Sequence, residues 1–87
     1  MYYVYLIISK NKKRTISYVG YTNNLKNRLN LHNASKGAKF TKGRKWKLIY
    51  YKKYKSKSEA MKYEYKLKKN YILRNKIKNE NFNFTTI

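Results

Sequence analysis

The sequence contains no cysteine, no proline and no aspartate, and its 87 residues include only three carboxylates, three glycines and one histidine. Without cysteine, neither a disulfide nor a thiolate metal site can form. A single histidine excludes a zinc site built from several histidines of one chain. No apolar run approaches the ~20 residues of a transmembrane helix. The apolar segment 2–8 is too short for a signal peptide and lacks a preceding basic region, so we expect a cytoplasmic protein with no membrane partner.

Positive charge dominates the sequence, with 23 lysine and arginine residues and a net charge of +20. Lysine, asparagine, isoleucine and tyrosine all have AT-rich codons, so a biased genome explains part of this composition. It does not explain the absence of aspartate, whose codons suit such a genome equally well. A chain this basic is typical of proteins that bind polyanions, and nucleic acid is the expected partner. The basic residues are spread along the whole chain, which disfavours a membrane surface.

The chain is expected to form one domain, residues 1–87, with a core over about residues 2–78 and a polar tail over residues 79–87. Runs rich in aromatic and β-branched residues predict three strands, the first two paired as a hairpin: residues 2–8, 16–21 and 46–54. Apolar residues at helical spacing predict three helices: from Thr22 or Asn23 to about Asn33, from a cap at Ser56 to about Asn70, and over residues 72–77. Residues 35–44 are expected to form a basic loop or a short helix. The order ββαβαα indicates a small α/β (α+β) fold, a three-stranded sheet packed against helices.

Glu64 is the most unusual residue, because it is one of only three carboxylates and lies where a helix should be apolar. Ala60, Leu67 and Tyr71 recur at helical spacing on the same face. A half-buried negative charge is costly unless a cation compensates it. A metal ion is one candidate, and a salt bridge to Lys68 at position i+4 is the other.

The two remaining carboxylates are weaker candidates for chemistry. Ser56 and Glu59 have the spacing of a capping box, which gives Glu59 a structural role at a helix start. Glu80 lies in the polar tail. Glu64 is therefore the only good carboxylate ligand, and one carboxylate suits a single hard divalent ion such as Mg²⁺ better than a two-metal site.

Three further residue types could act beside Glu64. Arg28 and His32 lie four residues apart and share one helix face. An arginine can hold a phosphate with two hydrogen bonds, and a histidine can accept a proton or orient a neighbour. Each could equally be an ordinary residue of a basic helix. Among the 11 tyrosines, Tyr18 lies close to Gly20, and a site rich in lysine and arginine is expected to lower a tyrosine pKa enough for a general base.

The ordered set of motifs resembles the GIY-YIG nuclease family. The matching segments are Tyr3-Val4-Tyr5, Tyr18-Val19-Gly20, Leu25-x-x-Arg28 with His32, and Glu64. Residues 37–44 and 58–64 are similar to the small stand-alone branch, which consists of little more than the nuclease domain. The resemblance covers residues 2–78. Tyr3 stands where the family name has glycine, and Tyr21 stands where some members carry lysine.

The resemblance implies a three-stranded antiparallel sheet flanked by helices, and divalent-metal-dependent cleavage of DNA phosphodiesters. Carried over to this chain, it makes Tyr5, Tyr18, Arg28, His32 and Glu64 the catalytic residues. Tyr18 is then the expected general base, with Tyr5 hydrogen bonded nearby and able to exchange that role. Arg28 would stabilise the charge at phosphorus, His32 would orient a tyrosine or phosphate, and Glu64 would hold one Mg²⁺ or Mn²⁺.

Lys39, Lys42 and Arg44 are the candidates for holding the DNA backbone, because each phosphate contact adds affinity. We expect a monomer or weak dimer. Two other functions remain open from the sequence: a nucleic-acid-binding module without catalysis, and a ribosomal-type RNA-binding protein.

Overall fold

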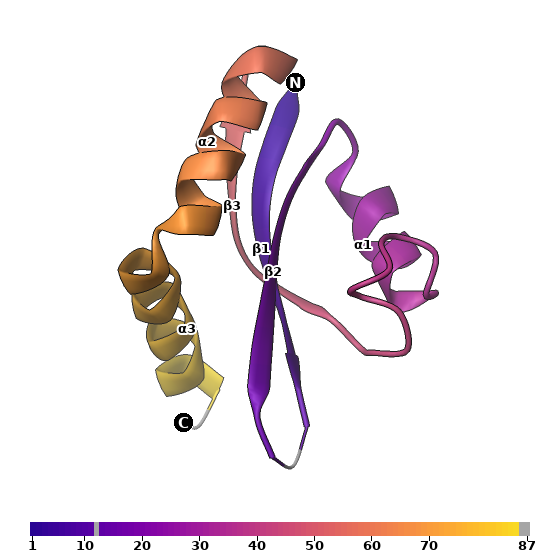
Figure 1. Ribbon diagram of the computed structural model, residues 1–87, viewed down its shortest axis with the longest axis vertical. Helices are drawn as coiled ribbons and strands as arrows, with labels where there is room; N and C mark the ends of the chain where they lie inside the picture. The colour runs from indigo at the N-terminus through magenta and orange to yellow at the C-terminus, as the bar shows by residue number, and fades with distance from the viewer. Residues whose placement is uncertain (12, 86–87) are drawn as a thin grey trace.

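The computed structural model describes residues 1–11 and 13–85, and this part of the chain has three strands and three helices in the order ββαβαα (Figure 1). The strands are β1 (Tyr2–Lys10), β2 (Thr15–Thr22) and β3 (Lys47–Tyr54), and the helices are α1 (Leu25–Asn33), α2 (Lys57–Lys69) and α3 (Tyr71–Thr85). Both neighbours of β1 are antiparallel to it, which gives the sheet order β2-β1-β3. The predicted three-stranded antiparallel sheet flanked by helices is confirmed.

The central strand β1 is buried on both faces, which explains its nearly continuous apolar sequence. Val4 and Leu6 point to the face covered by α2 and α3, where they pack with Ala60 and Leu67. Tyr5 belongs to the opposite face, which is covered by α1. Side chains alternate between the two faces along this strand, which places Tyr5 beneath the helix that carries Arg28 and His32.

Helices α1 and α2 both begin at a residue whose side chain caps the helix, as predicted, but the cap of α1 is a different residue from the predicted ones. The Ser56 hydroxyl caps α2 by accepting from the Glu59 backbone N–H at 3.1 Å, as the capping-box pattern predicts. Asn24 caps α1 by accepting from the Asn27 N–H at 3.1 Å. The prediction that Thr22 or Asn23 is this cap is wrong. Thr22 instead accepts from the Asn24 N–H and so orients the cap residue.

The two C-terminal helices are divided at Asn70, after which the sequence predicted a further short helix. The Asn70 backbone N–H donates to Leu67 at the end of α2, while its side chain accepts from the Leu73 N–H at the start of α3. Tyr71 therefore belongs to α3 and is 66% exposed, so the prediction that it shares the apolar face of Glu64 is wrong.

Helix α3 continues to Thr85, well beyond the predicted end at residue 77. The backbone of residues 79–85 is therefore helical, whereas the sequence predicted a polar tail. Residues 86–87 of that tail, and the side chains of its two phenylalanines, lie outside what the structure describes. None of the helices in the described residues is long and apolar enough to cross a membrane.

Candidate active site

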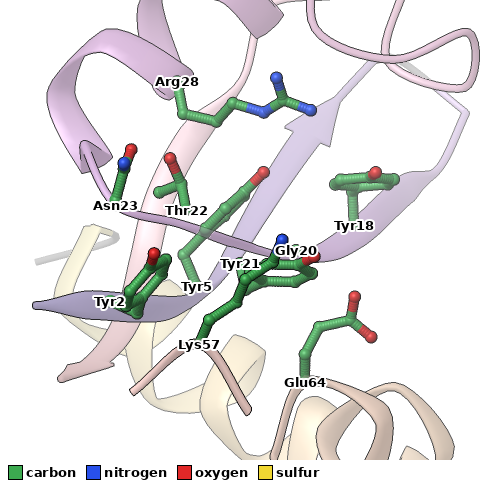
Figure 2. Close-up of a pocket in the computed structure, with 10 residues that line it drawn as sticks. All are labelled: Tyr2, Tyr5, Tyr18, Gly20, Tyr21, Thr22, Asn23, Arg28, Lys57 and Glu64. Atoms are coloured by element: carbon green, nitrogen blue, oxygen red, sulfur yellow. The ribbon is translucent and has the colours of Figure 1, made fainter. Parts of the chain in front are cut away.

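A cleft of about 420 Å³ opens at the edge of the sheet formed by β2, between α1 and the start of α2 (Figure 2). Its walls come from both outer layers of the fold as well as from the sheet. The residues that line it are Tyr2, Tyr5, Tyr18, Gly20, Tyr21, Thr22, Asn23, Arg28, Lys57 and Glu64. Four of the five predicted catalytic residues are therefore brought together from four different elements, β1, β2, α1 and α2.

Gly20 is required by the position of the Tyr5 ring. The two residues are directly paired in the β1–β2 ladder. A Cβ at position 20 would lie 2.6 Å from Cζ of Tyr5, closer than real Cβ atoms approach. The missing side chain of Gly20 thus leaves room for the Tyr5 ring to lie across β2 and to bring its hydroxyl to the cleft.

His32 lies behind the cleft and holds the Tyr5 hydroxyl. The Tyr5 oxygen is 2.7 Å from Nε2 of His32, and Nδ1 of His32 is 2.8 Å from the Thr41 hydroxyl. The Trp46 indole N–H donates to the Thr41 carbonyl at 2.9 Å. All four side chains are buried. His32 is therefore the one predicted catalytic residue that does not line the cleft, and it reaches the cleft only through Tyr5.

The hydrogen bonds around Thr41 indicate which atoms carry the protons in the hydrogen bonds that join Tyr5, His32 and Thr41. The Thr41 hydroxyl donates to the Ala38 carbonyl at 3.0 Å, and it has only one proton to give. It therefore accepts from His32 Nδ1–H, which leaves Nε2 as the acceptor of a neutral imidazole. The Tyr5 hydroxyl then donates to His32 Nε2.

Burial sets the protonation of both groups. It raises the pKa of Tyr5 to about 12, against an opposing interaction with the Arg28 side chain. It also lowers the pKa of His32, and the positive charge of Arg28 adds to that shift. The expectation that a basic site lowers a tyrosine pKa is wrong for Tyr5, because desolvation outweighs the nearby cation. The result is a protonated tyrosine next to a neutral histidine that can accept its proton.

Tyr18 enters the cleft from β2 beside the same histidine. Its ring meets the edge of His32 at 5.2 Å between centroids and stacks on Phe40 at 6.0 Å. The Tyr5 hydroxyl is hydrogen bonded close to Tyr18, and its partner is the imidazole of His32, which the Tyr18 ring also contacts.

Arg28 projects from α1 over the cleft (Figure 2). Its Nη2 makes one long hydrogen bond of 3.5 Å to the Gly37 carbonyl. Its Nε is buried and has no hydrogen-bond partner among the described residues. A buried N–H without a partner is costly and therefore rare. The guanidinium group also lines the cleft, and its planar set of N–H donors suits an anion such as phosphate there.

Glu64 lies at the cleft and also beside Lys68. Its side chain lines the cleft and is 17% exposed, and Oε1 lies 3.6 Å from Nζ of Lys68. Lys68 is 54% exposed, so this ion pair contributes little energy and leaves the carboxylate available.

The single carboxylate at the cleft, that of Glu64, fits one hard metal ion. No group of three or more histidine and glutamate side chains gathers anywhere in residues 1–11 and 13–85. A single carboxylate oxygen donor at an open cleft suits Mg²⁺ or Mn²⁺ held also by water and substrate phosphate. It does not suit a pair of metal ions, which needs several carboxylates.

The predicted backbone-binding residues lie outside the cleft lining. Lys39, Lys42 and Arg44 belong to the connection between α1 and β3. The lysine that does line the cleft is Lys57, which the sequence reasoning did not single out. A signal for it exists, since Lys57 precedes Glu64 by seven residues and so shares its helix face.

Gly37 and Thr41 were also missed as supporting residues. A Cβ at position 37 would lie 2.8 Å from Cε1 of His32, so this glycine permits the imidazole to be buried. Thr41 holds the other side of the same ring. Only the long-range contact with His32 identifies their role, and that contact leaves no pattern in the local sequence.

The chain is similar to one known family of domains and to several bacterial proteins that share one name. The family model described as the GIY-YIG catalytic domain matches residues 1–81. A UPF0213 protein of Oceanobacillus iheyensis is 46% identical over 68 residues, which cover 77% of this chain and 76% of the relative. A UPF0213 protein of Staphylococcus haemolyticus is also 46% identical, over 77% of this chain and 79% of its own length. A UPF0213 protein of Clostridium perfringens is 43% identical over 70 residues, which cover 79% of this chain and 72% of the relative. No solved structure matches this chain with statistical significance.

Proposed function

This chain belongs to the GIY-YIG family, and we propose that it is a divalent-metal-dependent endonuclease that hydrolyses phosphodiester bonds in DNA. The observation that carries the proposal is the convergence of Tyr5, Tyr18, Arg28 and Glu64 on one cleft. These residues supply a proton acceptor, a cation for the phosphate and a metal ligand, which are the groups that phosphodiester hydrolysis requires. The net charge of +20 supports a polyanionic substrate.

The hydrogen bond between Tyr5 and His32 favours Tyr5 as the group that activates water. A water molecule gives a proton to the Tyr5 oxygen while Tyr5 passes its phenolic proton to His32 Nε2. No phenolate accumulates, so the raised pKa of Tyr5 is no obstacle. The water oxygen forms a bond to phosphorus, the bond to the 3′ oxygen breaks, and that oxygen takes a proton from solvent. In this scheme Tyr18 positions water or phosphate, and its expected role as the base is the alternative to be tested.

Arg28 and Glu64 have complementary tasks. Arg28 donates to phosphate oxygens from the wall of the cleft and stabilises the charge that develops on them. Glu64 holds one Mg²⁺ or Mn²⁺, which when bound supplies Lewis-acid stabilisation of the phosphate and leaving oxygen. Lys57 adds a further positive charge at the cleft.

A cleavage panel tests this proposal. Purified protein is incubated with end-labelled duplex, flap, branched and single-stranded DNA and with structured RNA, in Mg²⁺, in Mn²⁺ and in chelator. We expect metal-dependent cleavage of DNA that leaves a 5′ phosphate and a 3′ hydroxyl. Salt-dependent DNA binding without any metal-dependent product would overturn the nuclease in favour of a binding module. A preference for structured RNA without cleavage would overturn it in favour of an RNA-binding protein.

A further inference from the structure

The connection between α1 and β3 presents an aromatic ring to solvent beside the cleft. Phe40 is 57% exposed, whereas its neighbour Thr41 is fully buried. Burial of a phenylalanine and exposure of a threonine would be the usual preference. Thr41 is buried because its hydroxyl forms a hydrogen bond with His32. That hydrogen bond does not explain why position 40 carries an exposed aromatic residue.

This connection is fixed at several points, so the position of Phe40 is defined. Thr41 is held by His32 and by the indole N–H of Trp46. The Gly43 backbone N–H donates to the Ser35 hydroxyl at 2.9 Å, and both of these residues have positive φ angles that close the turn. Phe40 is therefore displayed on an anchored segment.

The surroundings of Phe40 suit a nucleic-acid strand. One side of its ring stacks on Tyr18 at an interplanar angle of 22°, which places Phe40 next to a residue of the cleft. Lys39 and Lys42 flank it in the sequence and are exposed. All three carboxylates of the chain lie in α2 or α3, outside this connection. An exposed aromatic face between lysines, continuous with a phosphate-binding cleft, is the pattern of a base-stacking site.

We propose that Phe40 is a stacking platform for an unpaired nucleobase adjoining the scissile phosphate, with Lys39 and Lys42 binding the phosphates on either side. The proposal rests on the proposed function for the location of the scissile phosphate. A base within a duplex has both faces covered by its neighbours, so this platform selects unpaired strands. The competing explanation is that Phe40 serves only as an apolar cover over Tyr18 and Trp46, which its ring also contacts.

Binding measurements with three variants separate these explanations. Dissociation constants are measured in chelator, where no cleavage occurs, for a fluorescent single-stranded oligonucleotide and for the matching duplex. Phe40→Ala and Phe40→Leu should each weaken single-strand binding about tenfold, the typical loss of one stacked base. Phe40→Trp should retain it, because the aromatic face remains. Duplex binding should change little in all three variants.

The leucine variant decides the outcome, because leucine preserves an apolar cover but has no aromatic face. Wild-type binding by Phe40→Leu, equal losses on single strand and duplex, or no binding of single strands by the wild type would each overturn the stacking platform. Circular dichroism of each variant checks that the fold is retained. Lys42→Gln should reduce the salt dependence of binding, and the exposed hairpin variant Lys13→Gln should reduce it less. Because no turnover is needed, stacking without cleavage would reject the nuclease and keep this site.

Discussion

The hydroxyl oxygen of Tyr5 lies 2.7 Å from Nε2 of His32, and both side chains are buried although 27 residues separate them in the sequence. Packing of α1 on the sheet creates this pair. The histidine is neutral and accepts from the tyrosine, so the two side chains form a path along which one proton can leave the cleft. A tyrosine without this partner would have to become a phenolate to act as a base.

The first prediction concerns this pair. Tyr5→Phe and His32→Gln should each lower the single-turnover cleavage rate by roughly 10²- to 10⁴-fold, because each removes one end of the proton path. The double variant should be about as slow as either single variant, since residues that act as one unit are not additive.

Tyr3→Phe is the matched control, because Tyr3 lies on the same strand and face but does not line the cleft. It should cleave at the wild-type rate. A Tyr5→Phe variant with wild-type activity, together with an inactive Tyr18→Phe, would instead assign the general base to Tyr18.

The second prediction is a pH dependence of stability. The folded protein lowers the pKa of His32, so the unfolded chain takes up a proton near pH 6.5 that the folded protein resists. The free energy of unfolding should therefore fall as the pH drops from about 6.5 through the lowered pKa of His32. Below that pKa, His32 should cause no further change. Urea unfolding across this range measures it. His32 is the only histidine, so His32→Gln should flatten this part of the curve, and an unchanged curve would reject the lowered pKa.

The third prediction uses the contact between Gly20 and Tyr5. Gly20→Ala should destabilise the protein by about 1–3 kcal/mol, the usual cost of forcing an extra methyl group into packed surroundings. Its cleavage rate should also fall, because the Tyr5 ring is displaced.

A double-mutant cycle checks the cause of this loss. In a Tyr5→Ala background, which removes the ring, Gly20→Ala should cost much less. Equal costs in both backgrounds would show that contact with Tyr5 is not the reason for glycine at this position.

The fourth prediction separates function from stability at Arg28. Its buried Nε has no hydrogen-bond partner among the residues that the structure describes, so Arg28→Met should leave the melting temperature unchanged or raise it while abolishing cleavage. Added phosphate should stabilise the wild type but not this variant. Arg14→Lys, at an exposed position of the β1–β2 hairpin, controls for general arginine effects. A large loss of stability in Arg28→Met would give this residue a structural role instead.

Much of the fold was predictable because local patterns determine it. The continuous apolar run predicted the central strand, and the Ser56–Glu59 spacing predicted the start of α2. The end of α3 was missed because residues 79–85 are polar apart from two phenylalanines, and polarity alone does not indicate where a helix stops. The cap of α1 was assigned to the wrong residue because three neighbouring residues are all good cap residues: Thr22, Asn23 and Asn24.

The site was predictable only in part, for a different reason. Residue types and their order indicated Tyr5, Tyr18, Arg28 and Glu64, and the fold places all four at one cleft. The role of burial could not be read from composition, which suggested a lowered tyrosine pKa where desolvation raises that of Tyr5. The support of His32 by Thr41 and Gly37 depends on long-range packing and has no local signature.

The central claim is that Glu64 holds the metal ion required for cleavage, and a matched pair of variants tests it most directly. Glu64→Gln and Glu80→Gln carry the same change in charge and volume, but Glu80 is exposed on α3. Single-turnover cleavage is measured over a range of Mg²⁺ and Mn²⁺ concentrations. We predict that Glu64→Gln lowers the rate by roughly 10²-fold or more while Glu80→Gln retains the wild-type rate and metal dependence. Wild-type cleavage by Glu64→Gln would contradict the claim.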